Sequence, residues 1–102
     1  DYPNALNYFN QAIAKDSLFA YAYNNKGYVL IQEGNYSQAL EAVQKSLNLD
    51  NNNAYAYRNM AICYANMGDK TASCEALVVA GKVEYGLRIK EELEDLKVAY
   101  CQ

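Results

Sequence analysis

The chain has 102 residues, of which 52% are apolar and 21% are charged, and its net charge at pH 7 is −3. This composition excludes a disordered tail, and the length is sufficient for one domain with its own hydrophobic core. The acidic balance argues against nucleic acid as a partner, and no apolar run approaches the roughly 18–20 residues that membrane insertion requires.

Three helices are expected in the first half of the chain, at residues 3–15, 20–33 and 37–47. The second of these carries large side chains with few β-branched residues, and Gly34 ends it as a C-terminal stop. Ser37 can cap the next helix, in which apolar residues then recur on one face. A polar turn cluster at 50–53 follows and separates the two halves.

The second half repeats this arrangement, with helices at 54–67 and 71–83, the latter capped by Thr71, and adds a terminal helix within 88–102. One narrow arc of the terminal helix is apolar and its opposite face is charged; the arc consists of Ile89, Leu93, Leu96 and Tyr100. Such a helix is typical of the cap that shields the last repeat of a helical array. We therefore expect about five helices in the repeats, together with a C-terminal capping helix.

A displacement of 34 residues superimposes one part of the chain on the next. Ala-Tyr-Ala-Tyr at 20–23 recurs at 54–57, and the same shift carries Gly34 onto Gly68. Applied backwards, the shift makes residues 1–19 the second helix of a repeat whose first helix is absent. A chain that starts in mid-repeat and without Met is expected to be a processed product or a piece of a longer protein.

Two helices in a 34-residue unit resemble the tetratricopeptide repeat (TPR) family. The family's signature positions are occupied by Tyr23, Lys26, Gly27, Leu30, Ala39, Val43 and Asn51 in one unit, and by Tyr57, Met60, Ala61, Tyr64, Ser73, Leu77 and Tyr85 in the next. Lys26 and the missing Pro depart from the pattern. The resemblance implies an all-α fold, a right-handed α-solenoid of antiparallel helix pairs. It also implies that residues 1–102 form a single domain, made of a partial repeat (1–19), two repeats (20–53, 54–87) and a capping helix (88–102).

In the resembling family, the first helices of the repeats line a concave groove that grips extended peptides. The corresponding positions here are Tyr21, Asn24, Tyr28, Ile31, Gln32, Tyr55, Arg58, Ile62, Ala65 and Asn66. Tyrosine suits recognition because it offers apolar area at low entropic cost and keeps a hydroxyl group for hydrogen bonding. The alternative is that these rings merely cover gaps between thin helices.

One subgroup of the family clamps a C-terminal carboxylate with Lys and Arg beside an Asn. Asn25 and Asn59 match the Asn position, but Tyr55 and Asn59 stand where the cationic residues are expected. The resemblance therefore disfavours this mode of binding. Arg58 alone could still pair with an acidic group.

The sequence contains no motif that predicts an enzyme. There is no histidine, the commonest general base and metal ligand, and no Gly-rich phosphate loop or serine elbow is present. The three cysteines include no Cys-x-x-Cys pair, and Cys63 is interpreted as a small buried apolar residue. We expect no catalysis, no cofactor and no metal.

Cys74 and Cys101 form a candidate disulfide. Cys74 follows the signature residue Ser73, on the side of its helix that faces the terminal helix, and that helix ends in Tyr100-Cys101. This ending also resembles bacterial TPR proteins exported by species of the Bacteroidetes type. A bridge would favour a periplasmic or exported protein, and two free thiols would favour a cytoplasmic one, so the localisation stays open.

The sequence thus predicts a non-catalytic protein–protein interaction module that binds a peptide or protein segment in the groove. The alternative is a structural segment of a longer solenoid that serves assembly or homodimerisation. In the first helix, Ala5, Phe9 and Ala12 occupy positions that normally pack on the absent helix, while Leu6 and Ile13 face residues 20–33. We expect the first three to form an exposed apolar strip that favours a homo-oligomer or further chain upstream.

Overall fold

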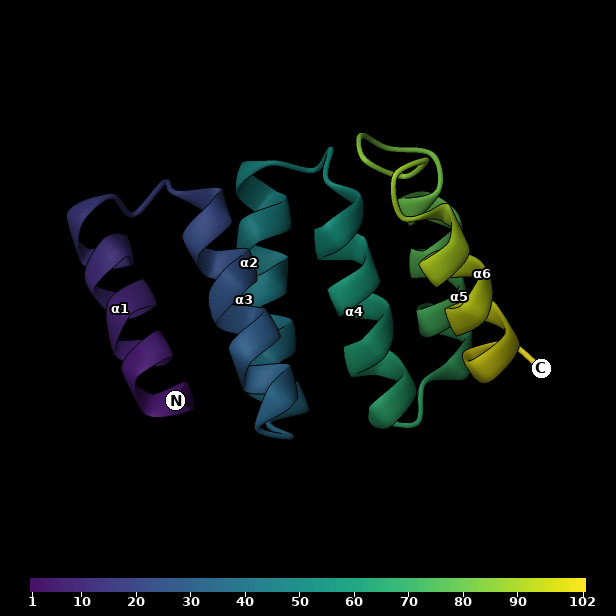
Figure 1. Cartoon of the computed structure of the whole chain (residues 1–102), viewed down its shortest axis with the longest axis horizontal. Helices are drawn as coiled ribbons and strands as arrows, with labels where there is room; N and C mark the ends of the chain where they lie inside the picture. Colours follow the sequence, from purple (N-terminus) through teal and green to yellow (C-terminus); the bar gives the residue numbers. More distant parts are fainter.

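The computed structural model describes all of residues 1–102 and contains helices but no strands (Figure 1). The expected all-α helical repeat fold is confirmed. The structure has the five expected repeat helices and the expected capping helix: α1 (Tyr2–Lys15), α2 (Ala20–Gln32), α3 (Tyr36–Leu49), α4 (Ala54–Asn66), α5 (Lys70–Ala80) and α6 (Lys90–Tyr100). They follow one another along the long axis of the molecule, so that α1 and α6 lie at opposite ends.

Glycine and side-chain caps set the helix ends. Gly34 and Gly68 follow α2 and α4 with φ values of +80° and +88°, a left-handed conformation that only glycine adopts without strain. The caps predicted at Ser37 and Thr71 are wrong, because each of these residues lies inside the first turn of its helix. The N-cap of α5 is Asp69, whose side chain accepts a hydrogen bond from the backbone N–H of Ala72.

Small residues let the paired helices α2 and α3 approach closely. A Cβ atom on Gly27 would stand 2.6 Å from Cγ2 of Val43, so the glycine is required by the spacing of the two helices. The Ser46 hydroxyl of α3 donates to the carbonyl of Ala20 at 2.8 Å. Ser73 of α5 donates to the carbonyl of Ala61 in α4, also at 2.8 Å. In both pairs a serine of the second helix is thus bonded to a backbone carbonyl of the first helix, although at different positions of the repeat.

Helix α6 caps the array through the apolar arc that its sequence predicts. Ile89 and Leu93 are buried in a cluster with Leu77 of α5, and Leu96 and Tyr100 pack against that cluster. The charged side chains of α6 lie on the opposite, exposed face. Because this burial closes the last repeat, α6 shields apolar surface that another repeat would otherwise cover.

The segment between α5 and α6 folds back onto the turn that precedes α4. Helix α5 ends at Ala80 rather than at residue 83, and hydrogen bonds to the Asn52–Ala54 turn hold the segment beyond it. The N–H of Ala54 donates to the carbonyl of Glu84 at 2.9 Å, and the N–H of Glu84 donates to Oδ1 of Asn52 at 3.0 Å. These contacts hold the following residue, Tyr85, in a left-handed conformation with φ +71°.

The apolar strip expected on α1 is not bare. Ala5, Phe9 and Ala12 are half-buried, as are Leu6 and Ile13. Within α1 itself, the ring of Tyr8 covers that of Phe9 edge-on, with the ring centroids 5.4 Å apart. The most exposed aromatic side chain of α1 is Tyr8 itself, at 66%.

No helix of the structure combines the length and the apolar character that crossing a membrane requires.

Candidate functional site

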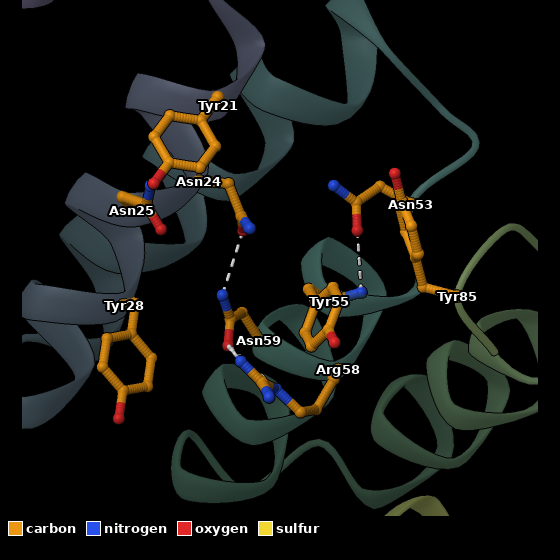
Figure 2. Close-up of a pocket in the computed structure, with 9 residues that line it drawn as sticks. All are labelled: Tyr21, Asn24, Asn25, Tyr28, Asn53, Tyr55, Arg58, Asn59 and Tyr85. Atoms are coloured by element: carbon orange, nitrogen blue, oxygen red, sulfur yellow. Dashed lines mark hydrogen bonds between the residues drawn. The ribbon is translucent and has the colours of Figure 1, made fainter. Parts of the chain in front are cut away.

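An open pocket of about 450 Å³ lies between α2, α4 and the segment after α5 (Figure 2). Its walls come from the first helices of both repeats, which is the face that the sequence singles out. We call it the tyrosine pocket. It is lined by Tyr21, Asn24, Asn25, Tyr28, Asn53, Tyr55, Arg58, Asn59 and Tyr85.

Half of the positions proposed from sequence meet in this pocket, and the others do not. Those that meet are Tyr21, Asn24, Tyr28, Tyr55 and Arg58. Ile31 is buried in the core, and Ile62 packs against the same cluster. Gln32, Ala65 and Asn66 lie near the C-terminal ends of α2 and α4, beyond the pocket. The pocket therefore uses the N-terminal and central turns of the first helices.

Asn53 and Tyr85 line the pocket but were not among the residues proposed from sequence. Asn53 is the N-cap of α4, and its Oδ1 accepts a hydrogen bond from the backbone N–H of Tyr55 at 2.9 Å. Its place directly before a first helix is a sequence feature that could have indicated this role. Tyr85 reaches the pocket only because the segment around Glu84 folds back onto Asn52. No local pattern in the sequence indicates that contact.

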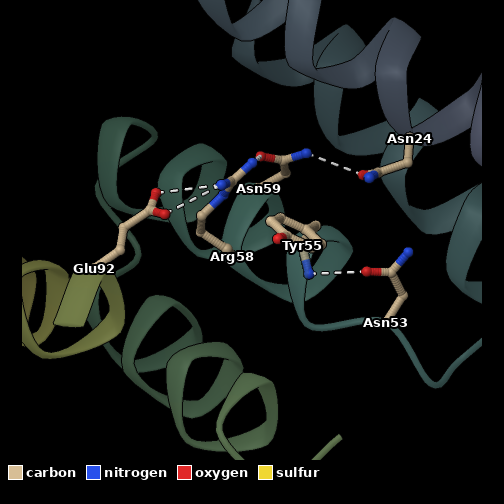
Figure 3. A network of polar contacts seen from close by, with 6 residues as sticks. All are labelled: Asn24, Asn53, Tyr55, Arg58, Asn59 and Glu92. Carbon is tan, nitrogen blue, oxygen red and sulfur yellow. Dashed lines mark hydrogen bonds and ion pairs between the residues drawn. The ribbon is translucent and has the colours of Figure 1, made fainter. Parts of the chain in front are cut away.

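A chain of polar side chains crosses the floor of the pocket from α2 to α6 (Figure 3). The amide of Asn59 donates to Oδ1 of Asn24 at 3.0 Å. Oδ1 of Asn59 in turn accepts from Nε and Nη2 of Arg58, at 3.3 and 3.1 Å. Nη1 of Arg58 then donates to both carboxylate oxygens of Glu92 on α6, at 3.3 Å each. The capping helix is thus connected to the pocket.

Arg58 is enclosed by aromatic rings as well as by Glu92. Its Cζ atom lies 5.9 Å from the ring centroid of Tyr28 and 5.2 Å from that of Tyr55, within the range of cation–π attraction. The ring of Tyr55 lies 5.8 Å from that of Tyr85, whose ring also has Arg88 over it at 4.9 Å. Arg58 is the only charged residue that lines the pocket, and it is paired with Glu92.

The one cysteine outside the disulfide has no catalytic surroundings. Cys63 is fully buried in α4, and this burial raises the pKa of its thiol from 9.0 to about 11. A thiol with a raised pKa is a poor nucleophile at neutral pH, because the thiolate is the reactive form. No group of three or more His, Cys, Asp and Glu side chains is arranged to hold a metal ion.

The structure joins Cys74 and Cys101 as a disulfide, with their Cα atoms 5.7 Å apart. Cys101 follows the last residue of α6, so its side chain is not restricted to the direction that the helical period would impose. The link ties the end of α6 to α5. Beside it, Nζ of Lys70 donates to the backbone carbonyl of Gln102 at 2.7 Å.

Comparison with known families and proteins finds repeats of one kind. A family model described as TPR repeat matches residues 27–68, and one described as Tetratricopeptide repeat matches residues 8–41. Together they span residues 8–68, more than half of the chain.

Three similar proteins illustrate how widely such repeats occur. The chain is 37% identical over 71 residues to Photosystem I assembly protein Ycf3 of Prochlorococcus marinus, and the match covers 67% of this chain and 41% of that protein. It is 35% identical over 69 residues to TPR repeat-containing protein MJ1428 of Methanocaldococcus jannaschii, a match that covers 68% of this chain and 12% of that protein. It is 27% identical over 85 residues to DnaJ homolog subfamily C member 7 of Homo sapiens, a match that covers 83% of this chain and 17% of that protein. The chain thus spans less than half the length of each of these relatives.

Proposed function

This chain belongs to the tetratricopeptide repeat family, and on that premise we propose that it is a non-catalytic protein–protein interaction module that binds a peptide or protein segment in the tyrosine pocket. The observation that carries the proposal is the convergence of four tyrosines, four asparagines and one neutralised arginine in an open pocket of about 450 Å³. Such a pocket offers ring surface and hydrogen bonds together, which is the combination that peptide recognition uses.

The exposure of the rings supports this proposal. Tyr21 is 64% exposed and Tyr28 is 45% exposed, although both lie on α2, whose other side is buried in the core. A ligand that covered these rings would remove apolar area from water at little entropic cost, because a tyrosine side chain has few rotatable bonds. The two rings contribute little to the protein's own core, so we expect their removal to affect binding more than folding.

A displayed library of random peptides, selected on the whole chain, tests the proposal. Selected peptides should bind at least about tenfold more weakly to Tyr21→Ala and Tyr28→Ala, since aromatic anchors dominate binding energy. Tyr8→Ala is the matched control, because Tyr8 is as exposed as Tyr21 but lies on α1, outside the pocket. Peptides that bind all of these variants as well as they bind the unmodified chain would overturn the proposal.

A second candidate function, assembly or homodimerisation through the α1 end, is favoured by the apolar side chains exposed there. These are Tyr2, Tyr8, Leu18 and Phe19, with 45, 66, 73 and 41% of their surface exposed. Sedimentation equilibrium of the whole chain tests this candidate. Self-association should weaken when Tyr8 and Leu18 are both changed to Ser, and a strict monomer over the accessible concentration range would exclude it.

A further inference from the structure

A second open groove, of about 300 Å³, lies where the end of α5, the connecting segment and α6 meet. It is at the C-terminal end of the array (Figure 1) and shares no lining residue with the tyrosine pocket. We call it the lysine groove. The lining residues that determine its chemistry are Val78, Lys82, Leu87, Lys90, Glu94 and Lys97.

Two of these lysines stand in α6 where the preceding first helix, α4, has buried side chains. The 34-residue displacement carries Ala56 onto Lys90 and Cys63 onto Lys97. Ala56 and Cys63 are both 0% exposed, and each belongs to a buried cluster with residues of α3. A charged side chain cannot be buried in this way without a large cost in free energy. The two lysines therefore keep α6 from closing on α5 as α4 closes on α3, and the groove is the space that remains.

The groove carries positive charge that the chain does not balance. Glu94 pairs with Lys97 at 3.5 Å, whereas Lys82 and Lys90 are exposed and form no ion pair within the chain. Three of the nine Lys and Arg residues line the groove, against one of the twelve Asp and Glu residues, although the net charge of the chain is −3. An occupant with two carboxylates would match the two unpaired ammonium groups.

Apolar side chains stand beside these lysines. Leu87 is the most exposed large apolar side chain of the protein, at 87%, and Val78 is 48% exposed. The carbonyl of Leu87 accepts a hydrogen bond from the backbone N–H of Lys90 at 3.4 Å, which ties the leucine to the start of α6. An occupant that covers Leu87 and Val78 would gain free energy from removing this apolar surface from water.

An anionic membrane would also offer negative charge and apolar material, but the surroundings of the groove disfavour it. Glu91, Glu92 and Asp95 lie on the same helix as Lys90, are exposed, and do not line the groove. A flat bilayer that reached Lys90 would bring its anionic headgroups close to these carboxylates and be repelled. A narrow peptide segment enters the groove without approaching them as closely.

We propose that the lysine groove is a second interaction surface, which takes an acidic segment of a partner protein. Two carboxylates of this segment pair with Lys82 and Lys90, and an apolar side chain between them covers Leu87 and Val78. The inference goes beyond the proposed function, because the tyrosine pocket has no part in this contact.

The test uses the hexapeptide Glu-Glu-Leu-Leu-Glu-Glu, blocked at both ends. It is titrated into the whole chain while the backbone amide signals are followed by NMR. The signals of Leu87 and Lys90 should shift, whereas those of Tyr21 and Tyr28 should stay in place. The matched peptide Gln-Gln-Leu-Leu-Gln-Gln lacks the charges and should bind at least about fivefold more weakly.

The decisive variant combines Lys82→Gln with Lys90→Gln. It should weaken binding of the acidic hexapeptide at least about fivefold, because both ion pairs are lost. Its matched control combines Lys15→Gln with Lys45→Gln, which changes the net charge equally at two exposed lysines outside the groove and should leave binding unchanged.

Leu87→Ser tests the apolar part of the contact and should weaken binding about threefold. Leu18→Ser is its control, because Leu18 is 73% exposed and lies outside the groove. All of these side chains are exposed, so the thermal midpoint of each variant should stay close to that of the unmodified chain.

Equal weakening by the two lysine double variants would show general attraction between charges and would overturn the proposal. Absence of binding, or binding that leaves the signals of Leu87 and Lys90 in place, would overturn it as well, and the lysines would then serve only to keep the end of the array soluble. Vesicles of phosphatidylserine and phosphatidylcholine in equal parts complete the comparison. If these vesicles, and not the hexapeptide, bind through Lys82 and Lys90, the partner is a membrane and the proposal falls.

Discussion

The side chain of Asn59 in α4 donates a hydrogen bond of 3.0 Å to the side chain of Asn24 in α2, and so joins the first helices of adjacent repeats. Asn59→Leu, which keeps the branching of the side chain, removes both this donor and the acceptor for Arg58. We expect a loss of about 1–3 kcal/mol in the free energy of unfolding, because buried polar groups are left unpaired. Urea unfolding measures it. Asn25→Leu, whose side chain has no partner within the chain, is the control, and an equal loss there would contradict the assignment.

Gly27→Ala should destabilise the protein by about 1–3 kcal/mol, because the new Cβ would stand 2.6 Å from Cγ2 of Val43 in a packed interface. The Val43→Ala change removes that methyl group, so the double variant should lose less stability than the two single losses added together. Thermal or urea unfolding of the four proteins gives this coupling. Strictly additive losses would mean that the two residues do not collide.

Burial of Cys63 should make stability fall at alkaline pH. The pKa of its thiol is raised from 9.0 to about 11 in the folded protein, so between these values the folded state holds a proton that the unfolded state has lost. This contribution is fully present below about pH 9 and is lost, at no more than about 1.4 kcal/mol per pH unit, as the pH rises through about 11. The difference in urea stability between the unmodified chain and Cys63→Ala isolates it from the titration of the tyrosines. A difference that stays flat over this range would contradict the raised pKa.

Reduction should loosen the capping helix, because it breaks the Cys74–Cys101 disulfide that ties α6 to α5. The bridge closes a loop of 27 residues, for which the chain-entropy model gives about 3–4 kcal/mol of stabilisation. We expect a lower thermal midpoint after reduction, or in the Cys74→Ser and Cys101→Ser double variant. Alkylation of the unfolded, unreduced protein should label Cys63 alone. Labelling of all three cysteines would show that the bridge is not formed.

Binding in the tyrosine pocket should depend only weakly on salt. Arg58, the only charged residue in the pocket wall, is already paired with Glu92 at 3.3 Å, so little long-range attraction remains to be screened. Affinity for a selected peptide should change by less than about threefold between low and moderate salt. Glu92→Gln uncovers the charge of Arg58 and should introduce a clear salt dependence for acidic peptides. A steep salt dependence in the unmodified chain would indicate binding steered by charge.

The positions of the helices could be predicted because two successive 34-residue units carry similar residues at corresponding positions, so each unit indicates the same helices. Glycine at 27 is required by the approach of α2 to α3, and glycines at 34 and 68 by the left-handed turns after α2 and α4. The end of α5 could not be predicted in this way. It depends on how the segment after Ala80 is held by Asn52 and Ala54, which lie about thirty residues earlier in the chain.

The residues of the candidate site also divide into those that the sequence could predict and those that depend on distant contacts. Tyr21, Tyr28, Tyr55 and Arg58 were proposed because, in the resembling family, their face of the first helices lines the groove, and residues of one helix face recur with the helical period. Tyr85 completes the pocket through a left-handed residue in a connecting segment, and its place depends on hydrogen bonds made far away in sequence. Non-local contacts of this kind leave no trace in a local pattern.

The connection between α5 and α6 has a consequence for engineering longer arrays from this chain. Gly86 has no room for a Cβ atom, which would stand 2.6 Å from the carbonyl oxygen of Ala80, and the neighbouring Tyr85 belongs to the pocket wall. A standard repeat grafted after residue 80 would replace this connection and remove that wall. An extra module added before α1 would leave it intact, so the N-terminal end is where the array can be lengthened without rebuilding the tyrosine pocket.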